Sequence, residues 1–579
     1  MKVFKNPFVL ATLLYISLVI LINPVGEFAI NDDWLYVRQV EHGVLDGIFK
    51  LSSYMGPSFI AQNLLGIIWG IIFGVSFTSL RILTILITIL VALGAYRILK
   101  YFKISNFIIL ISLLLIFFNP VVFTSSMSFM SEIYIVFGFV WSTYFYIRGF
   151  KENLLKFFIL GSIFAAFSLL VRHIGITLFI SFFLLLPFIE DRKVVFRKIF
   201  IPNFIIFISS LLLLFFWPRY QTDKLSVTPG FSSLFSNVLE IENIGEKCKM
   251  MLLSIPYYGF FIFPLISTTK LKLTRFFTLL FWFAVLFLSY VIFKFDIFAV
   301  GSVFYIEELY VKSYYRFDLS LFNNIPFKIF ISSVTSLCTL KIIYIIVKEG
   351  LRLKISRKFI SRNIYLVFMS LVSLLGFSIN FFTQGYYERY FIPPFIIFLI
   401  LIVILFCDRF LKRRLPILLG TFLMIFISFT LQFDYFSHTR IRWRQAETLQ
   451  KNTGLINGIF VDGVYARYYN SKKSNDYTGE VIGWGATNFS CYVEKNTFPG
   501  SSSILSMLKS LEKLFEKKIE NPRAYNSSKP QGLPSVKKNL DRLFYYDEYF
   551  SPLYSIIGKK AFVGSWCDKE FLDKISPVQ

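Results

Sequence analysis

The sequence has few of the residues from which metal and nucleotide sites are usually built. Among 579 residues there are five cysteines and three histidines. The cysteines have no metal-like spacing, which argues against a zinc or iron–sulfur centre. The sequence also lacks a glycine-rich loop of the kind that cradles nucleotide phosphates. Acidic residues are scarce too, because 35 Asp and Glu face 60 Lys and Arg, for a net charge of +25.

Apolar residues are abundant instead. Hydrophobic residues make up 56% of the chain, 72 residues are Phe, and the mean hydropathy is +0.64. A soluble protein cannot bury that much apolar surface, whereas a bilayer accepts it, so the sequence indicates a polytopic membrane protein. No Ala-x-Ala-like cleavage site follows the first apolar run, which is therefore interpreted as a retained span. The basic residues form short clusters between apolar runs, as the positive-inside rule predicts, which argues against nucleic-acid binding.

Runs long enough to cross the bilayer predict about thirteen transmembrane helices. They lie at residues 8–26, 80–99, 104–122, 133–150, 156–171, 174–189, 199–217, 250–267, 276–293, 326–347, 364–383, 391–407 and 415–431. Residues 27–77 are expected to form a juxtamembrane or re-entrant segment, because only then do all the dense basic loops fall on one side. This topology places the N-terminus in the cytoplasm and the chain after Leu431 outside the cell membrane.

The composition becomes polar after Leu431. We therefore expect two parts, a transmembrane module at 1–431 and a small extracytoplasmic α/β domain at 432–579. A helix is predicted around Arg442–Lys451, and strands at Ile456–Val464 and Ala561–Gly564. Cys491 and Cys567 would lie in an oxidising compartment, but the sequence leaves open whether they pair.

Two adjacent acids, Asp32 and Asp33, follow the first span directly. One such residue is enough to cap a juxtamembrane helix, which is the structural interpretation. Two carboxylates at the mouth of a hydrophobic bundle are costly, so we favour a general base or a metal ligand. The sequence requires no cofactor, although Mg²⁺ or Mn²⁺ bridging a carboxylate and a phosphate is compatible with it. Glu132 begins the fourth span on the same side, either as a helix-terminal acid after Ser131 or as a second functional carboxylate.

Arg389 lies between Glu388 and Tyr390, at the outer start of a predicted span. A cation at a helix N-terminus opposes the helix dipole, so its presence is better explained by an anion held between the guanidinium and the free backbone N–H groups. A phosphate or diphosphate fits, because the arginine fork matches its oxygens. A salt bridge with a neighbouring acid is the alternative.

Three further residues are weighed in the same way. Arg81 is a cation at the N-terminus of the second predicted span, where it opposes the helix dipole as Arg389 does. It is therefore also a candidate phosphate ligand. Arg172 and His173 end an outward-running helix, where cations are favourable. A structural role is therefore preferred for this pair, with phosphate or substrate contact second.

Taken together, these residues resemble the GT-C superfamily of membrane glycosyltransferases, in particular the aminoarabinose-transferase and protein-mannosyltransferase type. The likeness is carried by Asp32-Asp33-Trp34-Leu35-Tyr36 after the first span, Pro57 to Gly74, Arg81, Asn119-Pro120 before Glu132, and Glu388-Arg389-Tyr390 before Pro393-Pro394. The family usually has Asp where this chain has Glu132, and the C-terminal part shows no matching motif.

The resemblance implies transfer of a sugar from a polyprenyl-phosphate carrier to a lipid, glycan or protein acceptor on the outer face of the cell membrane. It implies that Asp32, Asp33 and Glu132 are catalytic, and that Arg389, Tyr390, Arg81 and Arg172 hold the donor phosphate. Tyr36, Glu388 and His173 would contact substrate. A flippase, transporter or non-catalytic envelope protein is the competing class, but we find no internal repeat, and the charges gather at one face rather than at mid-depth.

Overall fold

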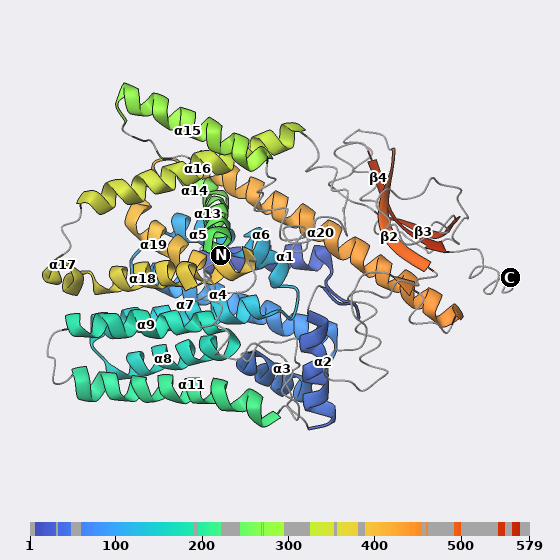
Figure 1. Cartoon of the computed structure of the whole chain (residues 1–579), viewed down its shortest axis with the longest axis horizontal. Coiled ribbons are helices and arrows are strands. Elements are labelled where there is room, and N and C mark those ends of the chain that lie inside the picture. The colour runs from blue at the N-terminus through green and yellow to red at the C-terminus, as the bar shows by residue number, and fades with distance from the viewer. Residues whose placement is uncertain are drawn as a thin grey trace.

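The structure is a computed structural model in which a helical bundle continues into one long helix with strands beside it (Figure 1). It describes residues 6–30, 33–47, 59–189, 195–221, 244–267, 269, 271, 273–294, 325–352, 356–379, 388–453, 459–460, 491–499, 542–549 and 559–567. Asp32 and most of the loops predicted at 218–249 and 294–325 lie outside the described residues.

The helices are numbered as in Figure 1. The first half of the chain forms α1 (Pro7–Ile22), α2 (Asp33–Leu45), α3 (Ile60–Phe73), α4 (Phe77–Tyr101), α5 (Asn106–Phe117), α6 (Pro120–Ser125), α7 (Ser131–Glu152), α8 (Leu155–Val171), η2 (His173–Gly175), α9 (Ile176–Leu185), η3 (Leu186–Phe188), η4 (Val195–Phe200) and α11 (Ile201–Gln221). The second half forms α13 (Ile244–Phe261), α14 (Phe263–Ile266), α15 (Arg275–Lys294), α16 (Ile325–Arg352), α17 (Arg357–Arg362), α18 (Ile364–Ser378), η7 (Glu388–Phe391), α19 (Ile392–Leu411) and α20 (Arg414–Thr453).

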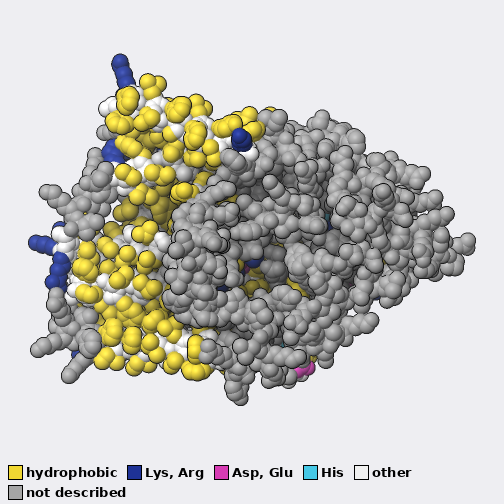
Figure 2. Space-filling model, viewed as in Figure 1, with side chains coloured by type: hydrophobic (Ala, Val, Ile, Leu, Met, Phe, Trp, Pro, Cys, Tyr) yellow, Lys and Arg dark blue, Asp and Glu magenta, His cyan; other side chains and the backbone are white. Residues whose placement is uncertain are grey.

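Six described helices are long and apolar enough to cross a membrane. They lie within Phe77–Tyr101, Lys198–Trp217, Arg275–Lys294, Ile329–Glu349, Arg389–Leu411 and Arg414–Lys451. Shorter apolar helices accompany them, so the chain is a multi-pass, membrane-type helical bundle, while the total of about thirteen spans stays a prediction. In Figure 2 the apolar side chains form a broad band, and Lys and Arg side chains gather along one edge of it.

The predicted span at 104–122 is broken in the structure. α5 ends at Phe117, and α6 begins at Pro120 after a turn through Asn119. The Asn119 side chain accepts hydrogen bonds from the N–H groups of Val121 and Val122, so it caps the new helix. Proline is favoured at the first position of a helix because it has no N–H to leave unpaired. The break turns the chain toward α7 and the Glu132 region.

Helix α3 occupies the segment for which a re-entrant or interfacial position is predicted. Its 14 residues extend about 21 Å, less than the ~30 Å of a bilayer core. Gln62, Asn63 and Gly66 are buried against the neighbouring helices, whereas Ile68 and Ile72 are exposed. An apolar outer face and a polar inner face suit a helix that lies at the bilayer boundary.

The predicted boundary at residue 431 falls inside α20, which continues without interruption to Thr453. Four strands, β1 (Ile459–Phe460), β2 (Cys491–Pro499), β3 (Arg542–Tyr549) and β4 (Lys559–Cys567), form a sheet in the order β1-β2-β4-β3. The sheet lies beside the C-terminal half of α20 (Figure 1). β1 and β4 overlap the two predicted strands, and the β2–β4 register places Cys491 opposite Cys567. The separate α/β domain and a disulfide between these cysteines stay predictions.

Helices α7 and α8 pack against each other at close range. The Ser168 hydroxyl donates to the carbonyl oxygen of Ile135 across the pair at 3.0 Å. Gly138 makes this approach possible, because a Cβ atom there would lie 2.9 Å from the carbonyl oxygen of Phe164. Small residues allow membrane helices to pack at such short range.

We therefore expect Gly138→Val to separate α7 from α8. Overpacking of this kind costs about 1–3 kcal/mol. The melting temperature of the purified protein in detergent should fall, while Ile163→Ala, on the exposed side of α8, should change it little. An unchanged melting temperature for Gly138→Val would contradict the close packing of this pair.

Candidate functional site

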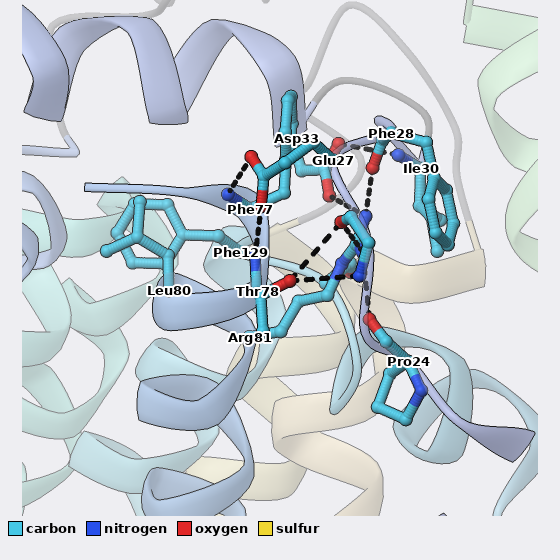
Figure 3. A network of polar contacts seen from close by, with 12 residues as sticks. Pro24, Glu27, Phe28, Ile30, Asp33, Phe77, Thr78, Leu80, Arg81 and Phe129 are labelled. Carbon is cyan, nitrogen blue, oxygen red and sulfur yellow. Dashed lines mark hydrogen bonds and ion pairs between the residues drawn. The ribbon is translucent and has the colours of Figure 1, made fainter. Parts of the chain in front are cut away.

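Arg81 holds the loop that follows α1. It is the fifth residue of α4 and is only 1% exposed. Its Nη1 donates to the carbonyl oxygens of Pro24 and Gly26, at 3.0 Å each, and its Nη2 donates to that of Phe28 (Figure 3). Its guanidinium also lies 4.4 Å from the centre of the Phe28 ring. This burial on backbone carbonyls argues against the predicted phosphate role, because Arg81 organises the loop instead.

Two acids complete this arrangement. Asp33, the first residue of α2, is fully buried, and its Oδ1 accepts a hydrogen bond from the N–H of Ile30 at 2.7 Å. Its Oδ2 lies 3.8 Å from Nη2 of Arg81. Glu27, which the sequence reasoning missed, accepts from the N–H groups of Phe77 and Thr78 at the start of α4 (Figure 3). A carboxylate at a helix N-terminus is favourable. Glu27 thus joins the loop to the start of α4, and Asp33 joins it to the start of α2.

Glu132 is the centre of a second cluster. It lies in the first turn of α7, is 2% exposed, and its Oε1 is 3.0 Å from Nη2 of Arg172 and 3.3 Å from Nε of Arg389. Arg172 follows the last residue of α8, and Arg389 lies in η7. The structure therefore brings one carboxylate and two guanidinium groups together from distant parts of the chain. The ion pair of Arg389 with Glu132 is a salt bridge of the kind that the sequence left open as the alternative explanation of Arg389.

Each residue of the segment Phe129–Glu132 contacts a different part of the site. The Phe129 carbonyl oxygen accepts from Nε2 of Gln62 at 3.1 Å, and the Met130 sulfur lies 3.9 Å from Nη1 of Arg389. The Ser131 hydroxyl accepts from Nε of Arg172 at 2.7 Å. The Glu132 carboxylate then holds both arginines. Ser131 is the first residue of α7, and no side-chain hydrogen bond caps this helix.

Aromatic rings enclose the arginines. Arg172 lies 4.3 Å from the centre of the Tyr390 ring and 5.6 Å from that of Phe59, while Arg389 lies 5.8 Å from Tyr390. Tyr36 packs on Phe59 with ring centres 5.3 Å apart. Tyr36 and Tyr390 therefore belong to the same site as the charged cluster. Cation–π contacts of this kind keep guanidinium groups in place at low desolvation cost.

His173 and Glu388 are the two remaining residues predicted to contact substrate. His173 is half-buried in η2, next in sequence to Arg172, and Glu388 begins η7, with its side chain outside the described residues. A further histidine, His42 in α2, lies 2.7 Å from an Asp46 carboxylate oxygen. Burial lowers the pKa of His42, although the hydrogen bond to Asp46 opposes that shift.

The charge of the Glu132 cluster distinguishes it from the Arg81 loop. Among the described ion pairs, Arg172 and Arg389 both meet the carboxylate of Glu132, so these three side chains alone sum to one positive charge. Such an arrangement attracts an anion, and the planar fork of arginine suits phosphate oxygens. Among the described residues, no group of three or more His, Cys, Asp or Glu side chains is placed to hold a metal ion. Mg²⁺ or Mn²⁺ at Asp32 therefore stays a prediction.

No protein-family model matches this sequence, and no curated protein matches it. The fold is similar to the oligosaccharyltransferase AglB from Archaeoglobus fulgidus, solved with an inhibitory peptide and a dolichol-phosphate, at a TM-score of 0.42 and 15% identity. That match covers 83% of this chain, which spans 60% of the length of AglB. ArnT from Cupriavidus metallidurans, bound to undecaprenyl phosphate, matches at a TM-score of 0.40 and 10% identity over 99% of both chains.

These similarities agree with the predicted resemblance to GT-C membrane glycosyltransferases. Because both TM-scores are below 0.5 and the identities are low, they establish neither the activity nor the substrates of this chain.

The geometry predicts that Arg81 contributes mainly to stability. Lysine keeps the positive charge but lacks the fork that reaches three carbonyl oxygens. Each lost charged hydrogen bond costs about 1.5–3 kcal/mol, so Arg81→Lys should lower the melting temperature of the purified protein by several degrees. Arg97→Lys, at an exposed position in the same helix, is the matched control. A stable Arg81→Lys protein that binds polyprenyl phosphate poorly would restore the phosphate role.

Proposed function

We propose that this protein is a membrane glycosyltransferase that moves a sugar from a polyprenyl-phosphate donor to an acceptor at the extracytoplasmic face. The observation that carries the proposal is the convergence of two arginines, Arg172 and Arg389, on the buried carboxylate of Glu132. Arg389 lies in η7, which runs directly into α19. A lipid phosphate has the charge and the position to fill this site.

The mechanism follows from the same geometry. The donor phosphate would be held by Arg172 and Arg389, which stabilise the negative charge that develops on it as the sugar–phosphate bond breaks. Glu132 would keep the two guanidinium groups at fixed positions, a positioning role in place of the catalytic role expected from the sequence. The polyprenyl phosphate is the group that leaves the sugar, so no nucleotide is needed.

The general base would come from the loop that Arg81 holds. Asp33 is fully buried, accepts the Ile30 N–H, and lies near Arg81, which suits it to keep the loop in shape. We therefore propose Asp32 as the group that takes a proton from the acceptor hydroxyl or amine. The orientation of the membrane bundle, with this site outside the cell, follows from the distribution of basic loops.

The phosphate role predicts a specific binding defect. Arg172→Gln and Arg389→Gln should each weaken binding of undecaprenyl phosphate to the full chain in nanodiscs. Loss of a charged hydrogen bond worth about 1.5–3 kcal/mol corresponds to roughly a 10- to 100-fold increase in Kd. Binding of uncharged undecaprenol should be unaffected, and Arg97→Gln should bind as the wild type does. Equal binding by all of these variants would rule out a lipid-phosphate site here.

The catalytic proposal is tested by separating the two aspartates. Asp32→Asn should abolish sugar transfer, measured as the surface-glycan or glycolipid profile of cells that express only the variant, and should leave the amount of folded protein unchanged. Asp33→Asn should reduce the melting temperature, because it weakens the link to Arg81. A normal glycan profile with Asp32→Asn would contradict the enzyme hypothesis and favour a transporter or scaffold.

A further inference from the structure

Two successive layers of side chains, one aromatic and one of carboxamides, pack between α2 and α3. In the first layer, Tyr36 of α2 meets Phe59, which immediately precedes α3, with ring centres 5.3 Å apart. About one turn further along each helix, the Asn63 side chain donates to Oε1 of Gln39 at 2.9 Å. Gln62 is adjacent, and donates to the Phe129 carbonyl oxygen. An aromatic layer is therefore followed by a layer of three carboxamides.

These carboxamides are buried but incompletely bonded. Gln62 and Asn63 are 0% exposed and Gln39 is 6% exposed. In the described part of the chain, Gln39 Nε2, Gln62 Oε1 and Asn63 Oδ1 are buried and have no hydrogen-bond partner. Buried polar atoms in native proteins are nearly always bonded, so a group of three at one place calls for a specific explanation. A ligand that supplies the missing partners provides one.

The chemistry of the unfilled positions indicates what the ligand is. The atoms without a hydrogen-bond partner are one neutral amide nitrogen, which donates through N–H, and two neutral carbonyl oxygens, which accept. Hydroxyl groups satisfy both kinds, because each can donate and accept, whereas a phosphate or carboxylate would leave the two acceptors unpaired. The aromatic layer beside them offers an apolar face for the C–H side of a sugar ring. A neutral polyol next to aromatic rings is the chemistry of a carbohydrate.

The seam is connected to the arginine site at two points. Arg172 lies 5.6 Å from the centre of the Phe59 ring, and the Phe59 N–H donates to the carbonyl oxygen of Val171 at 3.0 Å. Gln62 binds Phe129, three residues before Glu132. A sugar attached to a phosphate at Arg172 would thus meet the aromatic layer first and the carboxamides next.

We propose that Gln39, Gln62 and Asn63 form the subsite that binds the hydroxyl groups of the donor sugar. This inference rests on the proposed function, because it takes the phosphate at Arg172 and Arg389 as its starting point. It deepens that function by assigning the donor sugar to the α2–α3 seam, with Tyr36 and Phe59 at the ring and the three carboxamides at its hydroxyls. The carboxamides therefore determine specificity for the sugar and not for the lipid.

The test compares a sugar-bearing lipid with a sugar-free one. Full-length wild type, Gln39→Met and Asn63→Leu in nanodiscs are titrated with undecaprenyl phosphate and with a panel of undecaprenyl-phosphate-linked hexoses and pentoses. The wild type should prefer at least one member of the panel to undecaprenyl phosphate. Each variant should lose that preference by roughly tenfold or more, because hydrogen bonds to the sugar are gone. Undecaprenyl phosphate itself should bind all three proteins equally.

Stability separates this role from a purely structural one. Gln39 and Asn63 bond to each other, so replacing both in the double variant Gln39→Met/Asn63→Leu removes the whole buried hydrogen bond and should leave the melting temperature nearly the same or raise it. Gln432→Met is the matched control, since Gln432 is also a buried carboxamide with an unpartnered Nε2 and lies on α20 beside Thr124. It should not alter the sugar preference. If the double variant Gln39→Met/Asn63→Leu lowers the melting temperature and retains the sugar preference, the carboxamides are structural and the inference is wrong.

The outcomes also distinguish this inference from the function on which it rests. If Arg172→Gln weakens binding of undecaprenyl phosphate while the carboxamide variants keep the sugar preference, only the subsite is refuted. A wild type that prefers no sugar in the panel likewise refutes the subsite alone. If Arg172→Gln leaves lipid binding unchanged, the phosphate site itself fails.

Discussion

The structure of the candidate site depends on one buried carboxylate, that of Glu132. A charge removed from water is tolerated only when it is paired, and here the pairing partners come from the end of α8 and from η7. Without the acid, Arg172 and Arg389 would repel each other in a poorly hydrated setting. The neighbouring residues of the same segment bind α3 and both arginines. One short stretch, residues 129–132 at the start of α7, therefore determines where α7 meets α3, α8 and η7.

Arginine has two different uses in this protein. At the first loop, the Arg81 guanidinium is occupied by backbone carbonyl oxygens, with Asp33 close to it, so little of its charge is directed outside the fold. At the Glu132 cluster, two guanidinium groups share one acid, and a positive charge remains. The first arrangement gives a loop a fixed shape, and the second joins α7, α8 and η7 through one buried carboxylate. The two arrangements are linked by α2, which begins at Asp33 and whose Tyr36 packs on Phe59 near Arg172.

Much of this arrangement could be predicted from the sequence. Hydropathy and the positions of basic clusters indicated a membrane bundle and placed Asp33, Glu132 and Arg389 on one face, and the break at Asn119-Pro120 follows from capping rules. The role of Arg81 could not be predicted, because a cation at a helix start looks the same in sequence whether it meets phosphate or carbonyl groups. Pairing between Arg172 and Glu132 also depends on tertiary contacts. The carboxamides of the α2–α3 seam give no periodic signal, and the continuity of α20 was hidden by a change of composition at residue 431.

The length of α20 has a mechanical consequence. Its 40 residues form a rod of about 60 Å, roughly half of which lies past the point where the apolar sequence ends. Along that half, Arg440 donates to backbone carbonyls at the end of α1, Phe436 packs on Phe28, and Trp443 packs on Phe77 at the start of α4. The loop that precedes Asp33 is thus held against a stiff helix that also contacts the sheet. Because both contacts lie on one unbroken helix, a displacement of the sheet would be transmitted to that loop as a tilt of the whole helix.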